Sequence, residues 1–229
     1  MRDKPIFKRG QYFRRAVNTF LPRFLFSLSI RKSFARKYWQ NQDSGDQHGY
    51  ENYLVHFPRI DVLISEVKTR DSGNATILDL GCNCGYQLSL LKKAGFSSLT
   101  GIDICSPAIE FGKKNLDLEG IELIVGSFED VLPRLLSEKR RFDLIYSMGA
   151  TLELVHPSFD IIRSICSLSN DYIILGISEW GHAYPRFWEY EFNSHGFAMV
   201  KCIRPLEGEK RLVDPSKEES LLVFQRIEK

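Results

Sequence analysis

The chain has 229 residues, 43% of them hydrophobic and 26% charged, which is enough for one compact domain with a sizeable core and an accessory segment. This composition excludes a disordered, collagen-like or coiled-coil protein. The five cysteines are an odd number, and most lie in or beside apolar runs. They favour buried thiols in a reducing, cytoplasmic setting over a disulfide framework.

The formal net charge of +2 conceals an uneven distribution along the chain. Residues 1–40 hold eleven Lys or Arg and one acid, a balance of +10, whereas the remainder holds 20 basic and 28 acidic residues. Such a segment is typical of contact with a polyanion, and its interleaved aromatic residues favour an anionic lipid surface. Its apolar stretch, residues 16–30, is too short to span a bilayer. We therefore expect a basic, aromatic-rich extension over residues 1–46 and one domain over residues 47–229.

Within that domain, residues 49–68 are expected to form a helix, interrupted at Pro58, ahead of the first strand. Short apolar runs then alternate with helical stretches, a pattern that predicts strand–helix–strand units and a parallel sheet. The predicted strands are residues 76–80, 99–103, 122–125, 142–147 and 171–177. Two further runs, residues 196–203 and 220–227, have no long helix between them and predict an antiparallel pair at one edge of the sheet.

The most informative motif is ILDLGCNCGYQLSLL, residues 77–91. A predicted strand leads into Asp79, and Gly81, Asn83 and Gly85 follow at alternate positions before a helix begins. Glycines allow a close backbone approach to a ligand, and Asn tolerates the left-handed conformation best among the other residues. We expect this loop to present backbone N–H groups beneath a ligand. Asp103 ends the next predicted strand, where a carboxylate can accept the hydroxyls of a ribose.

The pattern Asp-x-Gly-x-Asn-x-Gly resembles the first motif of class I S-adenosylmethionine-dependent methyltransferases, over roughly residues 50–229. The resemblance implies an α/β fold with a doubly wound, mostly parallel seven-stranded sheet in the order 3-2-1-4-5-7-6, preceded here by a helical extension. It also implies S-adenosyl-L-methionine as cofactor. Carried over by position, the cofactor-binding residues are Asp79, Gly81, Asn83, Gly85, Asp103, Ile104, Ser127, Phe128 and Ser147. Ser127 stands where the family usually has an acid, and Glu129 is the candidate substitute.

The segment after the fourth predicted strand, residues 147–157, carries the candidate acceptor chemistry. Methyl transfer needs mainly in-line positioning, but a hydroxyl acceptor benefits from a general base, a role that suits histidine. His156, with Glu153 three residues before it, is the first candidate and His182 the second. The alternative for His156 is a structural role in capping the next helix. Trp180, Tyr184 and Arg186 are candidate acceptor contacts, whereas Trp188 and Phe192 are expected in the core.

These observations predict a methyltransferase that methylates an oxygen of a small or lipid-linked acceptor, such as a glycan, near a membrane surface. The expected location is cytoplasmic, peripheral on the inner face of a membrane. Two alternatives remain open at this stage. One is an RNA methyltransferase whose basic arm contacts phosphates, and the other is a protein that binds the cofactor without turnover.

Overall fold

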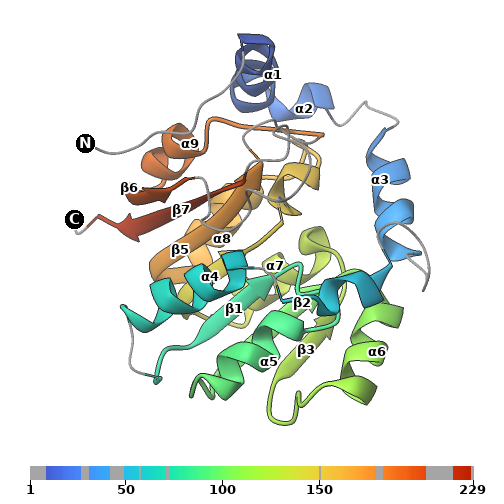
Figure 1. Ribbon diagram of the computed structural model, residues 1–229. Coiled ribbons are helices and arrows are strands. Elements are labelled where there is room, and N and C mark those ends of the chain that lie inside the picture. Colours follow the sequence, from blue (N-terminus) through green and yellow to red (C-terminus); the bar gives the residue numbers. More distant parts are fainter. Residues whose placement is uncertain are drawn as a thin grey trace.

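The computed structural model describes residues 9–26, 31–41, 49–56, 58–70, 73–149, 151–178, 183–204 and 219–227. Its centre is a seven-stranded sheet in the order β3-β2-β1-β4-β5-β7-β6, which confirms the predicted topology (Figure 1). Strands β1 to β5 are parallel, and β7 runs antiparallel to both β5 and β6. The strands are β1 (Ile77–Leu80), β2 (Leu99–Asp103), β3 (Glu122–Val125), β4 (Phe142–Ser147), β5 (Ser169–Ser178), β6 (Phe197–Ile203) and β7 (Glu219–Arg226).

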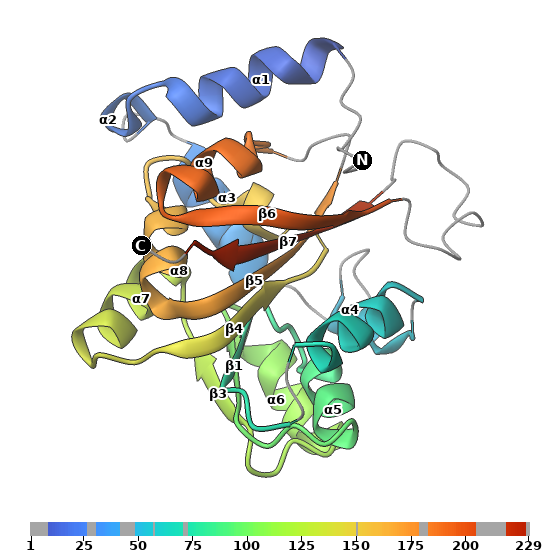
Figure 2. The same ribbon diagram turned by 90° about the vertical axis from the view of Figure 1, so that its left-hand side faces the viewer.

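Helices cover both faces of this sheet, as Figure 2 shows. One face carries α4 (Pro58–Lys68), α5 (Tyr86–Lys93) and α6 (Ser106–Asn115), and the other carries α7 (Phe128–Ser137), α8 (Ile161–Leu168) and α9 (Trp188–Ser194). Each face has its own hydrophobic cluster, one around Leu63 and Leu88 and the other around Ile162 and Phe192. All four residues of β1 are buried because both of its faces are covered, as in other parallel sheets. Trp188 and Phe192 lie in the core as predicted.

Two local boundaries differ from or refine the sequence-based expectations. Residues 49–68 form a short 3-10 helix, η1 (Tyr50–Leu54), and then α4, which begins at Pro58 where the interruption was expected. A second short 3-10 helix, η2 (Thr151–Leu154), follows β4. Helix α6 is capped by Cys105 and has proline in its first turn, where its missing N–H costs nothing.

The N-terminal residues form three helices that lie against the domain: α1 (Arg9–Phe20), α2 (Arg23–Phe26) and α3 (Arg31–Gln40). In Figures 1 and 2, α1 lies across the outer side of α9. The third helix, α3, lies beside the edge of the sheet at which the parallel strands end (Figure 1). None of the helices in the described ranges is long and apolar enough to cross a membrane.

Candidate active site

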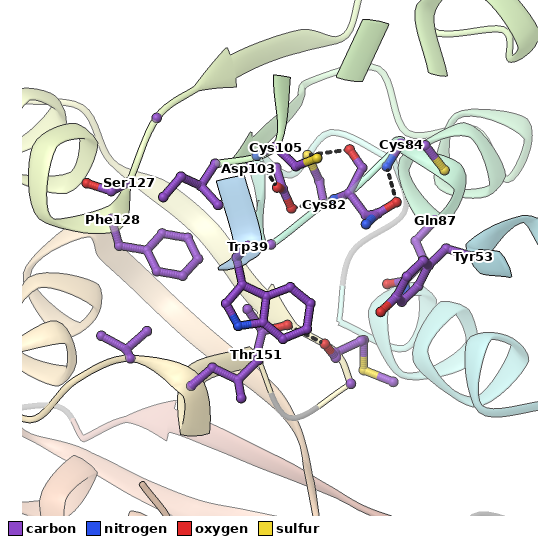
Figure 3. A pocket seen from close by; sticks show the side chains of 18 of the residues that line it. Trp39, Tyr53, Cys82, Cys84, Gln87, Asp103, Cys105, Ser127, Phe128 and Thr151 are labelled. Carbon is purple, nitrogen blue, oxygen red and sulfur yellow. Dashed lines mark hydrogen bonds between the residues drawn. The ribbon is translucent and has the colours of Figure 1, made fainter. Parts of the chain in front are cut away.

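A pocket of about 220 Å³ opens at the carboxyl ends of β1, β2 and β4. Ligand sites in open α/β sheets form at this edge because the loops that follow parallel strands meet there. The walls come from the loops that follow β1, β2, β3 and β4, from η1, α4 and α5, and from α3 of the N-terminal extension (Figure 3). The lining residues include Arg36, Trp39, Tyr53, Arg59, Gly81, Asn83, Asp103, Ile104, Ser127, Phe128, Glu129, Met148, Thr151 and His156.

The glycine loop between β1 and α5 has three residues in left-handed conformations. Gly81, Asn83 and Gly85 have φ values of 84°, 50° and 80°. The left-handed Asn83 confirms the expectation from the sequence, and its side-chain oxygen accepts a hydrogen bond from the Cys84 amide at 2.8 Å. A Cβ atom on Gly81 would lie 2.5 Å from Cγ2 of Thr151, so this glycine lets the loop approach η2 closely.

The hydrogen bonds of this loop correct one expectation, because its amides are engaged within the protein. The Gly81 and Cys82 amides both donate to the Ile102 carbonyl, and the Gly85 amide donates to the Cys82 carbonyl. The Asn83 and Cys84 amides donate to carboxylate and amide oxygens. What the loop offers a ligand is therefore close approach and carbonyl oxygens, which match a cationic group such as an ammonium better than a phosphate.

Asp103 joins this loop to the end of β2. One carboxylate oxygen accepts from the Asn83 amide and the other from the Cys105 amide, each at 2.8 Å. Burial raises the pKa of Asp103, and these amide bonds oppose that shift. Each carboxylate oxygen has a further lone pair, and Asp103 lines the pocket, so it can still accept from a ligand hydroxyl.

Asp79 and Ser147 lie beneath the pocket rather than in its lining. The Tyr146 hydroxyl donates to Asp79 at 2.8 Å, and the Ser147 hydroxyl donates to the Leu80 carbonyl at 2.8 Å. Burial raises the pKa of Asp79 to about 8, although the Tyr146 hydrogen bond opposes the shift. Both side chains thus join β1 to β4, and direct contact of either with a cofactor stays a prediction.

Ile104 after β2 and Ser127, Phe128 and Glu129 after β3 line the pocket. That they bind the cofactor stays a prediction. The Ser127 hydroxyl, however, donates to Asp130 at 2.6 Å and caps no helix amide. Phe128 and Ile104 supply apolar surface against which a flat ring can pack.

Helix α3 closes the same region from outside, which the sequence did not reveal. Arg36 bonds to Asp130 at 2.7 Å and lies 3.9 Å from Glu129. In Figure 3 the Trp39 indole points into the pocket between Phe128 and Thr151. The only feature of the sequence that could have indicated this contact is the tryptophan at position 39 in a basic stretch. Nothing in that stretch indicates which part of the domain it contacts.

His156 lies at the other end of the pocket and is 5% exposed. Its Nδ1 accepts from the Ser158 amide at 3.2 Å and lies 3.0 Å from the Ser158 hydroxyl. The neutral ring therefore carries its proton on Nε2. A general base acting through Nε2 needs the other tautomer, so the base role stays a prediction and these bonds count against it. The Phe26 and Tyr184 rings flank His156 edge-on, at centroid distances of 5.8 Å and 5.1 Å.

The structure corrects the expected role of Glu153. Its side chain is fully buried outside the pocket lining, and Oε1 lies 3.8 Å from Nη2 of Arg15 in α1. Arg186, a candidate acceptor contact, is also fully buried and pairs with Glu191 at 3.2 Å. Both residues hold the N-terminal helix and α9 in place rather than facing an acceptor. His182 and Trp180 lie outside the described residues.

Sequence comparison supports these features. The family profile described as "Methyltransferase domain" matches residues 71–207. A malonyl-[acyl-carrier protein] O-methyltransferase from Priestia megaterium is 39% identical over 105 residues, which cover 45% of this chain and 36% of that protein. The EEF1A lysine methyltransferase 2 of Danio rerio is 40% identical over 78 residues, covering 34% of this chain and 33% of that protein. The chain thus spans about a third of the length of these curated relatives.

Structural comparison gives the same fold over nearly the whole chain. The magnesium protoporphyrin IX methyltransferase of Synechocystis PCC 6803, solved with bound S-adenosylmethionine, superimposes with a TM-score of 0.58. The alignment covers 98% of this chain and all of that one, at 12% sequence identity. At this identity the likeness concerns the fold.

Proposed function

Since the chain belongs to the class I S-adenosylmethionine-dependent methyltransferases, we propose that it methylates an oxygen atom of a small or lipid-linked acceptor, such as a glycan or a carboxylate. The O-methyltransferase from Priestia megaterium supports an oxygen acceptor. A cytoplasmic place on the inner face of a membrane is part of this proposal.

The observation that carries the proposal is a pocket lined both by Asp103 and by His156. We call the part lined by Asp103 the cofactor end and the part lined by His156 the acceptor end. The residues present fit S-adenosylmethionine. The Asp103 carboxylate can accept ribose hydroxyls, Ile104 and Phe128 can flank the purine, and the carbonyls of the glycine loop can accept from the ammonium group. When bound, this cofactor supplies a methyl group on a positively charged sulfur.

The remaining task of the chain is to orient two reactants and exclude water. Trp39, Met148 and Thr151 also line the pocket. Met148 is 6% exposed, and Trp39 and Thr151 are partly buried, so these side chains can displace water from a bound acceptor. An acceptor held there would meet few competing water molecules.

The hydrogen bonds of His156 favour an acceptor oxygen that arrives ionised. With Nδ1 accepting from Ser158, Nε2–H can donate to a carboxylate without any change of tautomer. A hydroxyl acceptor would instead need the Nδ1–Ser158 bond to be broken before Nε2 could accept its proton. Among oxygen acceptors, we therefore place a carboxylate ahead of a sugar hydroxyl.

The test is transfer of a labelled methyl group from S-adenosylmethionine by the full chain into a cell extract. The extract is then separated into lipid, small-molecule, protein and RNA fractions. Mild base releases methanol from a methyl ester but not from a methyl ether, so the label reports the acceptor chemistry. We expect base-labile label in the lipid or small-molecule fraction. His156→Ala should reduce it about 10- to 100-fold, because it removes a hydrogen bond of about 1.5–3 kcal/mol to the acceptor carboxylate.

Other outcomes contradict the proposal in distinguishable ways. Base-stable label in the same fractions would replace the carboxylate by a hydroxyl. Label confined to RNA would favour an RNA methyltransferase. Cofactor binding without transfer to any fraction would indicate a binding protein.

A further inference from the structure

Helix α1 buries a polar face against the domain, whereas an ordinary surface helix buries an apolar face. Gln11, Arg15 and Asn18 face the domain and are 8%, 0% and 9% exposed. These positions follow the i, i+4, i+7 spacing of one helical face, which in a surface helix is normally apolar. Phe13 of α1 is 74% exposed, whereas Tyr12 and Phe20 are about half exposed and each also contacts the Phe187 ring.

The buried polar face is fixed by hydrogen bonds to the segment before α9. Arg15 donates to the Arg186 carbonyl, and Asn18 donates to the Pro185 carbonyl at 2.8 Å. The Phe187 amide donates to the Thr19 hydroxyl at 3.0 Å. Rotating α1 to bury its apolar side would break these bonds and separate Arg15 from the buried Glu153. The orientation of the helix is therefore determined by its polar side.

The outer side of α1 and α2 is consequently a large exposed apolar surface. Phe13 is 74% exposed, Phe24 68% and Phe20 56%. We call this surface the aromatic face, and it consists of Tyr12, Phe13, Phe20, Leu21, Phe24 and Leu25. Figure 2 shows α1 and α2 along the outside of the molecule. Several exposed aromatic side chains on two adjacent helices are typical of an interaction site.

The charge of the surrounding segment restricts what can cover this face. Residues 1–40 contain eleven Lys or Arg and one acid, a balance of +10. An occupant must therefore accept aromatic side chains and carry negative charge. The interface of an anionic lipid bilayer does both, because phenylalanine inserts at the acyl boundary while cations remain among the headgroups.

We propose that the aromatic face docks on an anionic membrane surface, with α1 lying in the plane of the interface. The aromatic face lies near the acceptor end of the pocket. Phe26, which ends α2 directly after Phe24 and Leu25 of the face, contacts the His156 ring. If the proposed function holds, this arrangement also indicates the class of acceptor. The acceptor is an amphiphile whose polar end reaches His156 while its apolar part remains in the bilayer.

The experiment is co-sedimentation of the full chain with phosphatidylcholine vesicles, with and without phosphatidylglycerol, at low and high salt. We expect binding to the anionic vesicles at low salt and a part that survives high salt, because aromatic insertion is not screened. Phe13→Ser with Phe24→Ser should weaken this binding at least about tenfold. Val125→Ser with Ile227→Ser is the matched control, since these side chains are 49% and 45% exposed elsewhere.

Three results would overturn docking: no binding to anionic vesicles, an equal loss in the control, or RNA binding with a steep salt dependence in place of vesicle binding. Calorimetry with S-adenosylhomocysteine on every variant separates this inference from the proposed function. A chain that binds S-adenosylhomocysteine but ignores the vesicles has lost only the docking inference. A chain that binds the vesicles but not S-adenosylhomocysteine keeps docking and loses the proposed function.

Discussion

The two ends of the pocket are assembled over very different distances along the chain. At the cofactor end, Asn83 and Asp103 are 20 residues apart and meet through the loop between β1 and α5. Next to the acceptor end, outside the pocket lining, Arg15 donates to the Arg186 carbonyl across 171 residues. The cofactor end is thus a local property of two neighbouring strand ends. The acceptor end depends on an N-terminal segment that charge alone would describe as a separate arm.

The largest expected effect tests whether α1 is an integral part of the acceptor end. Arg15→Met removes the guanidinium beside the buried Glu153 and should lower the free energy of unfolding by about 3–5 kcal/mol. Replacing both residues, Arg15→Met with Glu153→Leu, should recover most of that loss. Denaturant unfolding measures both, with Arg14→Met as the exposed control. If Arg15→Met costs no more than Arg14→Met, α1 does not help to hold this end together.

At the cofactor end, the buried Asp79 predicts a pH dependence of stability. Its folded pKa of about 8 lies above the ordinary value of 3.8, so between these values the folded state holds a proton that the unfolded state has lost. Stability should therefore fall as pH rises through this window, by at most about 1.4 kcal/mol per pH unit. Unfolding from about pH 5 to pH 8 should show a steeper decline for the wild type than for Asp79→Asn. Parallel curves would contradict the shift.

Asp103 tests the cofactor end directly. Asp103→Ala should weaken S-adenosylhomocysteine binding at least tenfold, because charge-assisted hydrogen bonds contribute about 1.5–3 kcal/mol each before water compensates. The variant also loses the acceptors of the Asn83 and Cys105 amides, so thermal unfolding should accompany calorimetry. The exposed Asp117→Ala is the control. Unchanged affinity in a folded Asp103→Ala protein would remove Asp103 from the site.

The smallest expected effect is a difference in the free energy of unfolding between two glycine substitutions, which separates backbone strain from close packing in the glycine loop. Gly81 and Gly95 both have positive φ, but only at Gly81 would a Cβ meet a neighbour, Thr151. Both substitutions to Ala should cost about 1–2 kcal/mol through the left-handed conformation. Gly81→Ala should cost about 1 kcal/mol more and also weaken S-adenosylhomocysteine binding. Equal costs would mean that Thr151 moves aside freely.

The same contrast explains what could be predicted from the sequence. Apolar runs predicted all seven strands, because buried strands have a continuous hydrophobic pattern, and the resemblance to class I methyltransferases implied their order. Asn83 was predicted to be left-handed from its residue type and its place between two glycines. The capture of the loop amides by Ile102 and Asp103 was not predictable, since no pattern specifies where a neighbouring strand places its carbonyls.

The acceptor end was harder to predict because its contacts join distant segments. Glu153 is three residues before His156, which suggested that the two side chains act together. Its side chain instead points towards Arg15 in α1. The apolar residues of α1 indicated lipid from composition, but the inward polar face depends on backbone carbonyls of residues 185 and 186. Side-chain spacing within one helix does not encode such partners.

We predict that one bound molecule reaches from Asp103 towards His156, and a crystal structure of the full chain with S-adenosylhomocysteine tests this most directly. We expect the ribose hydroxyls on Asp103, with the Asn83 and Cys105 amide bonds retained, and the ring between Ile104 and Phe128. The sulfur should lie towards Met148 and face His156 across the pocket. A ribose bound away from Asp103, or a sulfur pointing towards Ser127, would contradict the account.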